Sequence, residues 1–158
     1  MTLRRGAQIA RELPSIHSPG ASGNTGIELA VLYTDPETTA AVLERAADLT
    51  AGLNATVALV AICAAPYQSP FGCPLSIQTH LTERLTELAN GCKLPVRAHL
   101  VLAPSRNDGF HWFLIPRSTV LIGARRRPWR TWEEKLAREL ADNGHRVALF
   151  RFVSRELR

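Results

Sequence analysis

Two continuous apolar segments constrain the fold of this chain more than any other feature. Residues 56–65 read TVALVAICAA and residues 119–122 read TVLI, without the alternation of apolar and polar side chains that marks a half-exposed strand. Such segments have both faces covered, as strands do in the middle of a parallel sheet between two layers of helices. The sequence therefore favours the α/β class.

Strand and helix patterns alternate along the chain from residue 27 onward. Strands are expected at residues 27–33, 56–65, 96–102, 119–122 and 146–153. Helices are expected after Asp35, from Ser76 to Gly91, over residues 110–114, and from Thr131 to Asn143. This alternation predicts a single open five-stranded parallel sheet, order 3-2-1-4-5, with helices on both faces. The alternating pattern of residues 96–102 is typical of a strand at a sheet edge.

Local signals mark two helix starts and one strand end. Asp35 is a capping carboxylate before a proline and an acid, which suits the positive end of a helix dipole. Thr131 and Glu134 have the spacing of a capping box. We expect Gly123 to end the fourth strand, because glycine permits backbone geometry that other residues avoid.

The first 26 residues differ in composition from the rest of the chain. They contain prolines and glycines among scattered polar residues, so they lack the apolar surface needed to offset the entropy of ordering. We expect a flexible N-terminal tail over residues 1–26 and one domain over residues 27–158. The alternative for the tail is a short docking helix with Leu3, Ile9, Leu13 and Ile16 on one side.

The cysteines and the lack of long apolar stretches bear on the compartment. Cys63, Cys73 and Cys92 show no C-x-x-C spacing, which argues against a disulfide framework and against a zinc site. Cys63 is expected to be a thiol in the core. No apolar stretch approaches the roughly 18–20 residues that span a bilayer, so we expect no membrane insertion and a cytoplasmic location.

The positive charge is concentrated in one segment. The net charge is +5, and most of it comes from four arginines interleaved with Trp129 and Trp132: Arg125, Arg126, Arg127 and Arg130. Guanidinium groups bind phosphate through two parallel hydrogen bonds, and indole rings stack on bases. A solvated loop is the equal alternative, and Glu133 and Glu134 at the next helix start oppose a phosphate there.

The predicted topology places this segment beside Asp35. In a sheet of order 3-2-1-4-5 the winding reverses between the first and fourth strands, and ligands of such sheets bind at the carboxyl ends of the strands there. Asp35 either contacts a ribose or adenine group or only caps its helix. The candidate nucleotide-binding residues are Asp35, Ile62, Gly123, Arg125, Arg126 and Arg127. No motif for catalysis or metal binding accompanies them, so we expect neither.

Three segments resemble the universal stress protein family, which has the α/β fold of the adenine-nucleotide alpha-hydrolase type. They are LYTDPET at residues 32–38, TVALVAICA at residues 56–64 and VLIGARRRP at residues 120–128. The ATP-binding branch of that family has Gly-x-x-Gly and a later Gly-Ser after the fourth strand. Gly123 matches the first glycine, but Arg126 stands at the second and residues 133–136 at the Gly-Ser position. The chain is more similar to the stress-protein-like domains of potassium-sensor histidine kinases and transporter-associated relatives.

The resemblance implies a regulatory or stress-response binding module without catalysis, with a degraded ATP motif. The exposed edge of the last strand is the natural docking surface, so we expect pairing with a second copy, or with a signalling or transporter protein, through that edge. The residues of that edge are Val147, Leu149, Phe150 and Phe152. One alternative is a sensor of ATP, AMP or cyclic di-AMP, so an adenine nucleotide is the candidate cofactor. Nucleic-acid binding through the Arg/Trp segment is the less favoured alternative.

Overall fold

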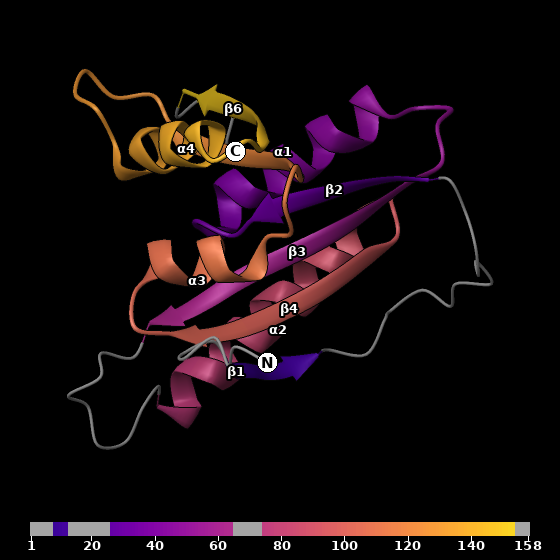
Figure 1. The fold of residues 1–158 in the computed structure, drawn as a ribbon. Helices are drawn as coiled ribbons and strands as arrows, with labels where there is room; N and C mark the ends of the chain where they lie inside the picture. Colours follow the sequence, from indigo (N-terminus) through magenta and orange to yellow (C-terminus); the bar gives the residue numbers. More distant parts are fainter. Residues whose placement is uncertain (1–7, 13–25, 65–73, 154–158) are drawn as a thin grey trace.

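The structure is a computed structural model, and it describes residues 26–64 and 74–153 together with the backbone of residues 8–12 (Figure 1). The strands are β1 (Gln8–Glu12), β2 (Ile27–Leu32), β3 (Ala55–Ala64), β4 (Val96–Ala103), β5 (Thr119–Arg125) and β6 (Arg146–Phe152). The helices are α1 (Pro36–Leu49), α2 (Leu75–Gly91), α3 (Arg106–Phe113) and α4 (Trp132–Asp142).

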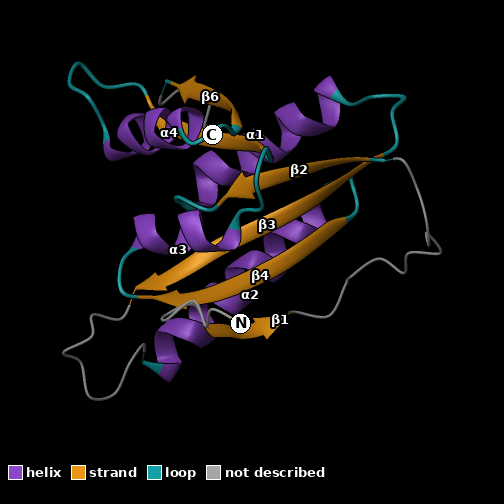
Figure 2. Ribbon diagram, viewed as in Figure 1, coloured by secondary structure: helices purple, strands orange, loops and turns teal. Residues whose placement is uncertain are grey.

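The predicted five-stranded parallel sheet is confirmed. Strands β4, β3, β2, β5 and β6 lie in that order and run parallel, which is the order 3-2-1-4-5 when they are counted along the chain from β2 (Figure 2). The central strand β2 pairs with β3 on one side and with β5 on the other. The winding therefore reverses between β2 and β5, as the alternation of elements predicts.

A sixth strand lies outside that prediction. β1 pairs antiparallel with β4, so β4 is the edge of the parallel part but not of the whole sheet. The register shifts by one residue between Ile9 and Arg11, which is a β-bulge. The expectation of a tail or docking helix is therefore wrong for residues 8–12, while residues 1–7 and 13–25 lie outside the described residues. The segment QIARE has one β-branched residue and no alternation of apolar and polar side chains, so its sequence carries no strand signal.

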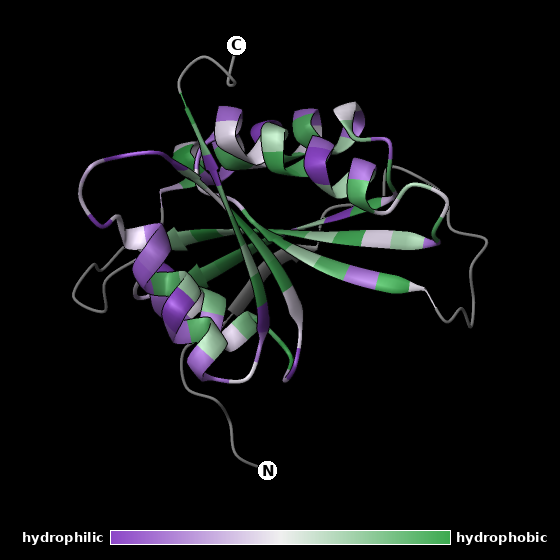
Figure 3. Cartoon of the chain, turned by 90° about the horizontal axis from the view of Figure 1, so that it is seen from above, coloured by the Kyte–Doolittle hydropathy of each residue, from purple (hydrophilic) through white to green (hydrophobic). Residues whose placement is uncertain are grey.

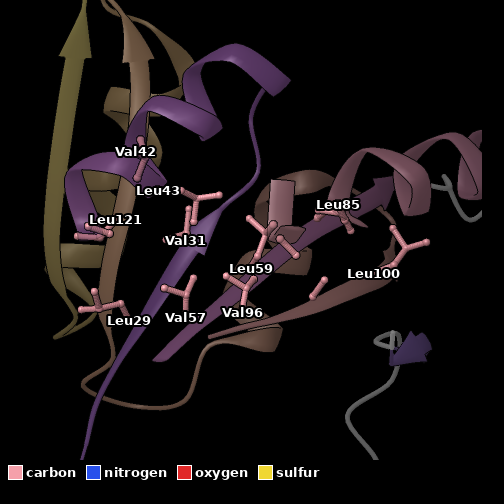
Figure 4. Close-up of a cluster of buried hydrophobic side chains, with 14 of the residues drawn as sticks. Leu29, Val31, Val42, Leu43, Val57, Leu59, Leu85, Val96, Leu100 and Leu121 are labelled. Atoms are coloured by element: carbon pink, nitrogen blue, oxygen red, sulfur yellow. The ribbon is translucent and has the colours of Figure 1, made fainter. Parts of the chain in front are cut away.

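Helices cover both faces of the sheet, as expected, and each face has its own core. Figure 3 shows the strands at the centre, mostly in the colours of hydrophobic residues, between helices of mixed character. On one face, side chains of the strands pack against Val42 and Leu43 of α1 and Leu85 of α2 (Figure 4). On the other face, the core includes Phe110 of α3 and Leu136 of α4. Each fully buried side chain of this size stabilises the fold by roughly 1.5–3 kcal/mol.

Side-chain caps fix three of the helix starts. Thr38 N–H donates to Asp35 Oδ1 at 2.9 Å, and Glu134 N–H donates to Thr131 Oγ1 at 3.4 Å, so both expected caps are confirmed. α3 begins earlier than expected, with Ser105 as its cap. α2 begins at Leu75 after Pro74, one residue before the expected start at Ser76, and it has no side-chain cap.

Gly123 has a different role from the one expected. β5 continues through it to Arg125, and the positive φ angles among the described glycines are at Gly52 and Gly144. A Cβ atom at position 123 would collide with the side chains of Thr38 and Val42. Gly123 therefore lets α1 lie close against β5, and backbone geometry does not require it.

Candidate functional site

The carboxyl ends of β2 and β5 bring Asp35 next to the arginine segment. Arg125 Nη2 lies 3.7 Å from Asp35 Oδ1, and Thr34 Oγ1 donates to the Gly123 carbonyl at 3.5 Å. Parallel strands end at the same edge of a sheet, so loops that follow neighbouring strands meet there. These distances confirm that Asp35 lies beside Arg125 and that Thr34 lies beside Gly123; they do not extend to Arg126 and Arg127.

Asp35 serves as the cap of α1 in this arrangement. The Oδ1 atom that accepts from Thr38 N–H is also the oxygen nearest Arg125. Tyr33, just before it in the chain, has a raised pKa because the ring is partly buried; Arg84 opposes this shift and Asp35 adds to it. The capping alternative thus accounts for Asp35 without a ligand.

Arg125 is held by carboxylates of this chain. Its Nη2 atom lies 2.7 Å from Glu37 Oε2, a closer contact than the one to Asp35. An anion at Arg125 would therefore have to displace Glu37. Both side chains are well exposed to solvent, so we expect the pair to contribute less than about 1 kcal/mol. The contacts of Arg125 therefore join the end of β5 to the start of α1.

The other three arginines of the segment are more available. Within the described part of the chain, Arg126, Arg127 and Arg130 have no ion-pair partner. Arg127 lies over the Trp129 ring at 5.5 Å, and 61% of Trp129 is exposed. An exposed indole with free guanidinium groups beside it can stack on a planar group and bind an anion. We call residues 126–130 the arginine loop.

The structure does not bring Ile62 together with the rest of the expected site. Ile62 is buried in the core under α3 and α4, where a Cβ atom on Gly109 of α3 would collide with it. The position of Gly123 faces α1 on the opposite side of the sheet. Alternate side chains of a strand point to opposite faces of the sheet. In a strand without polar residues, the sequence does not show which side chains point to the α1 face and which to the α3 face.

Two contacts at this end were missed by sequence reasoning. Glu37 was interpreted only as an acid at the start of a helix, although it is the nearest partner of Arg125. Arg106 of α3 lies 3.9 Å from the centroid of the Trp132 ring, on the face that α3 shares with α4. Each of these two contacts joins residues that are far apart in the chain. They could have been predicted only from the strand order together with the geometry of the side chains.

The edge strand β6 holds the expected pairing residues. Among the described residues, β6 pairs with β5 alone. Val147 and Leu149 pack against the core on the α4 face, and Phe150 lies 6.4 Å from Phe152 on the other face. Phe152 is buried, whereas Phe150 is half-buried. The expected residues are thus grouped along one edge of the sheet.

The cysteines differ from expectation. Cys63 is disulfide-bonded, so the expectation of a core thiol at this position is wrong. Disulfides are rare in reducing compartments, so the cysteines do not support the expected cytoplasmic location. Among the described residues, Cys92 is a free cysteine.

Two further kinds of feature are absent from the described part of the chain. No helix there combines the length and the apolar composition that crossing a bilayer requires. Residues 26–64 and 74–153 also bring together no group of three or more histidine, cysteine or acidic side chains placed to hold a metal ion.

No family model matches this chain, and no curated protein matches it significantly in sequence. The fold is that of an open, doubly wound α/β domain, and many unrelated functions occur on folds of this kind. The function must therefore be inferred from the geometry of the sheet end and the sheet edge.

Proposed function

We propose that this chain is a regulatory binding module of the universal stress protein type, which acts without catalysis and pairs with a second copy of itself through β6. The observation that carries the proposal is the open edge of β6. Seven consecutive residues form this strand, and its backbone groups on the outer side have no partner among the described strands. Such an edge readily accepts another strand.

The hydrogen bonds to β5 identify the backbone groups that point outward. Arg146 N–H donates to the Ser118 carbonyl, and the Phe152 carbonyl accepts from Arg126 N–H. In a parallel ladder, a residue directs both of its backbone groups to the same neighbouring strand, and the next residue directs both away. The backbone N–H and C=O groups of residues 146, 148, 150 and 152 therefore point to β5. The backbone groups of Val147, Leu149 and Arg151 point outward, away from the sheet.

This alternation favours one register for an antiparallel pair related by a two-fold axis. Centring the axis on Leu149 pairs Val147 with Arg151 of the second copy and overlaps all seven residues. Centring it on Arg151 would place two like charges opposite each other, which is unfavourable. Centring it on Val147 shortens the overlap. We therefore propose the Leu149 register, which would join the two sheets into one.

Side chains on both faces suit such a pair. In the Leu149 register, Ala148 lies opposite Phe150 of the second copy, at a position where cross-strand side chains approach most closely. Phe150 is half-buried within one chain, so the second copy would cover more of its ring. Pairs of this kind each contribute roughly 0.2–1 kcal/mol beyond the backbone hydrogen bonds.

Sedimentation of the full chain over a range of concentrations tests the proposal. We expect a reversible dimer, weakened by Phe150→Asp, because that change puts a charge into the joint surface. Ile115→Asp is the matched control, since Ile115 is exposed elsewhere on the molecule. A monomer at every concentration, or equal weakening by both substitutions, would contradict the proposed pairing.

The arginine loop supports a second candidate function, the binding of an adenine nucleotide such as ATP, AMP or cyclic di-AMP. Arg126, Arg127 and Arg130 lack carboxylate partners in the described part of the chain, and Trp129 exposes a flat ring beside them. A nucleotide at 100 times its dissociation constant stabilises the folded state by about 2.7 kcal/mol. A thermal-shift screen should therefore show a higher melting temperature with the nucleotide. This rise should vanish when Arg126, Arg127 and Arg130 are replaced by glutamine.

Two comparisons make the screen decisive. Arg125→Gln should leave most of the thermal shift intact, because Arg125 is already paired with Glu37. Single-stranded nucleic acid is the competing ligand class, and its binding would fall steeply with salt concentration. The absence of a shift with every nucleotide would remove this second function and leave the pairing through β6 untouched.

A further inference from the structure

A surface groove lies between α1 and α2, away from the arginine loop. Both helices cross from the carboxyl end of one parallel strand back to the amino end of the next, so their C-terminal halves lie at the amino end of the sheet. The groove has a volume of about 400 Å³. It is lined by Ala40, Leu43, Glu44, Ala47, Asp48, Glu87, Leu88, Gly91, Cys92 and Lys93. Its size is within the usual range for small-molecule sites, roughly 300–1,000 Å³.

The lining combines an apolar floor with acidic walls. Ala40, Leu43 and Ala47 of α1 and Leu88 of α2 supply the apolar part. α1 contributes the carboxylates of Glu44 and Asp48, α2 contributes that of Glu87, and Lys93 is the cation of the lining. Carboxylates therefore stand on both helices with hydrocarbon between them.

The backbone adds negative charge at the same place. The C-terminal end of a helix carries a partial negative charge, and a cation there is favourable. Neither α1 nor α2 has a basic residue in its last turn. Because the two helices run in the same direction, both negative ends act on this groove together with its carboxylates.

We propose that the groove binds a linear aliphatic polyamine, a cation with ammonium groups at both ends of a hydrocarbon chain. The ammonium groups would pair with Glu44 and Asp48 on one side and with Glu87 on the other. The methylene groups between them would cover the apolar floor, as the stems of lysine side chains cover apolar surface. This site is separate from the β6 edge and from the arginine loop.

One existing contact competes with the ligand. Arg84 Nη1 lies 3.2 Å from Glu87 Oε2, one helical turn before it on α2. This pair is exposed, and exposed pairs of this spacing contribute little to stability. An ammonium group can therefore share or take over Glu87 without a large loss of helix stability.

Calorimetric titration of the full chain with spermidine tests the proposal. We expect saturable binding of one spermidine per chain, weakened about tenfold by the combined change Glu44→Gln, Asp48→Asn and Glu87→Gln, since three exposed ion pairs are lost. The matched control is Glu28→Gln, Glu83→Gln and Asp142→Asn, which removes the same charge from exposed positions outside the groove. Equal weakening by both triple variants would show general surface attraction and would overturn the proposal.

A gain of affinity gives a second readout. Lys93→Gln removes the positive charge of the lining and should tighten spermidine binding about threefold. Unchanged or weaker binding by this variant would contradict the electrostatic account. Magnesium chloride at matched ionic strength should compete poorly and neutral pentanediol should not bind, because the groove offers charge and hydrocarbon together. Full competition by magnesium would reduce the site to an acidic surface and overturn the proposal.

Cys92 reports the location of the bound ligand. It lines the groove and is half-buried, and burial raises the pKa of its thiol, with a backbone hydrogen bond to Leu94 opposing the shift. Its alkylation by iodoacetamide, followed by peptide mass spectrometry, should be slowed by spermidine in the wild-type chain, and the groove triple variant should need about ten times more spermidine for the same slowing. Alkylation at an unchanged rate in wild-type chain saturated with spermidine would place the ligand elsewhere and overturn the proposal.

Discussion

The two edges of the sheet are finished in different ways. At one edge, β4 is covered by β1, a five-residue strand with a bulge in its pairing. At the other edge, β6 pairs in regular register over seven residues and is apolar apart from Arg146 and Arg151. Figure 1 places β1 and β6 at these opposite edges. Short or bulged edge strands resist pairing with another chain, whereas long regular apolar ones favour it.

Among the described residues, β6 is the edge that has no further partner strand. A protein that blunts one edge of its sheet and leaves a regular apolar strand at the other has a surface suited to a partner strand. Because backbone groups of β6 point alternately to β5 and outward, substitutions at neighbouring residues should affect either folding or pairing.

Ala148→Pro should have the largest effect. The backbone N–H of residue 148 faces β5, so proline removes a hydrogen bond inside one chain and disturbs the β5–β6 ladder. We expect the free energy of unfolding to fall by roughly 3 kcal/mol, because a ladder hydrogen bond is lost and the facing carbonyl of β5 is left without a partner. Urea denaturation measures the change. If this variant were as stable as the wild type, the backbone N–H of residue 148 would not point to β5.

Removal of residues 1–12 should make the two edges alike. It takes away β1 and leaves β4 open, so two regular edges become available to other chains. We expect a loss of roughly 2 kcal/mol in unfolding free energy, from a few net hydrogen bonds of about 1 kcal/mol each, and association beyond a dimer in light scattering. Removal of residues 1–7 alone keeps β1 and is the control; identical behaviour of the two truncations would show that β1 does not protect this edge.

Arg151→Pro should separate pairing from folding. Its backbone N–H faces outward and its side chain is exposed, so the chain itself loses little beyond the contact of Arg151 with Glu134. A two-fold pair loses two hydrogen bonds, which weakens it by roughly thirtyfold at about 1 kcal/mol each. Sedimentation should show this loss, and the thermal midpoint measured on the dilute monomer should be nearly unchanged. An unaltered dimer would exclude the Leu149 register.

Arg125→Gln should have the smallest effect. It measures how much the ion pair at the end of β5 contributes to the free energy of unfolding. The substitution removes the exposed pair with Glu37, and we expect a decrease of about 0.5 kcal/mol in unfolding free energy. Arg126→Gln is the control, since no ion pair of Arg126 exists among the described residues. A decrease above about 2 kcal/mol would mean that the pair contributes far more than exposed pairs do.

Much of the fold could be predicted from local patterns. The runs at residues 56–65 and 119–122 indicated buried parallel strands, and Asp35 and Thr131 marked helix starts that the structure confirms. These signals are local, because a cap acts within one turn and a buried strand shows its surroundings in its own composition. The strand order then followed from general rules of winding.

The rest depended on contacts between distant residues. β1 shows no strand pattern in its sequence, and Gly123 is explained only by the side chains of α1 that lie against it. The Glu37–Arg125 pair and the groove between α1 and α2 likewise require the packed structure. Ile62 was assigned to the site although it faces the other core, because an apolar strand does not show which face is which.

Hydrogen exchange of the β6 amides at several protein concentrations tests the proposed pairing most directly. At high concentration the amides of Val147, Leu149 and Arg151 should be protected, and dilution below the dimer dissociation constant should release them. The amides of Ala148, Phe150 and Phe152 should stay protected throughout, because they bond to β5. Rapid exchange at Val147, Leu149 and Arg151 at every concentration would contradict the account.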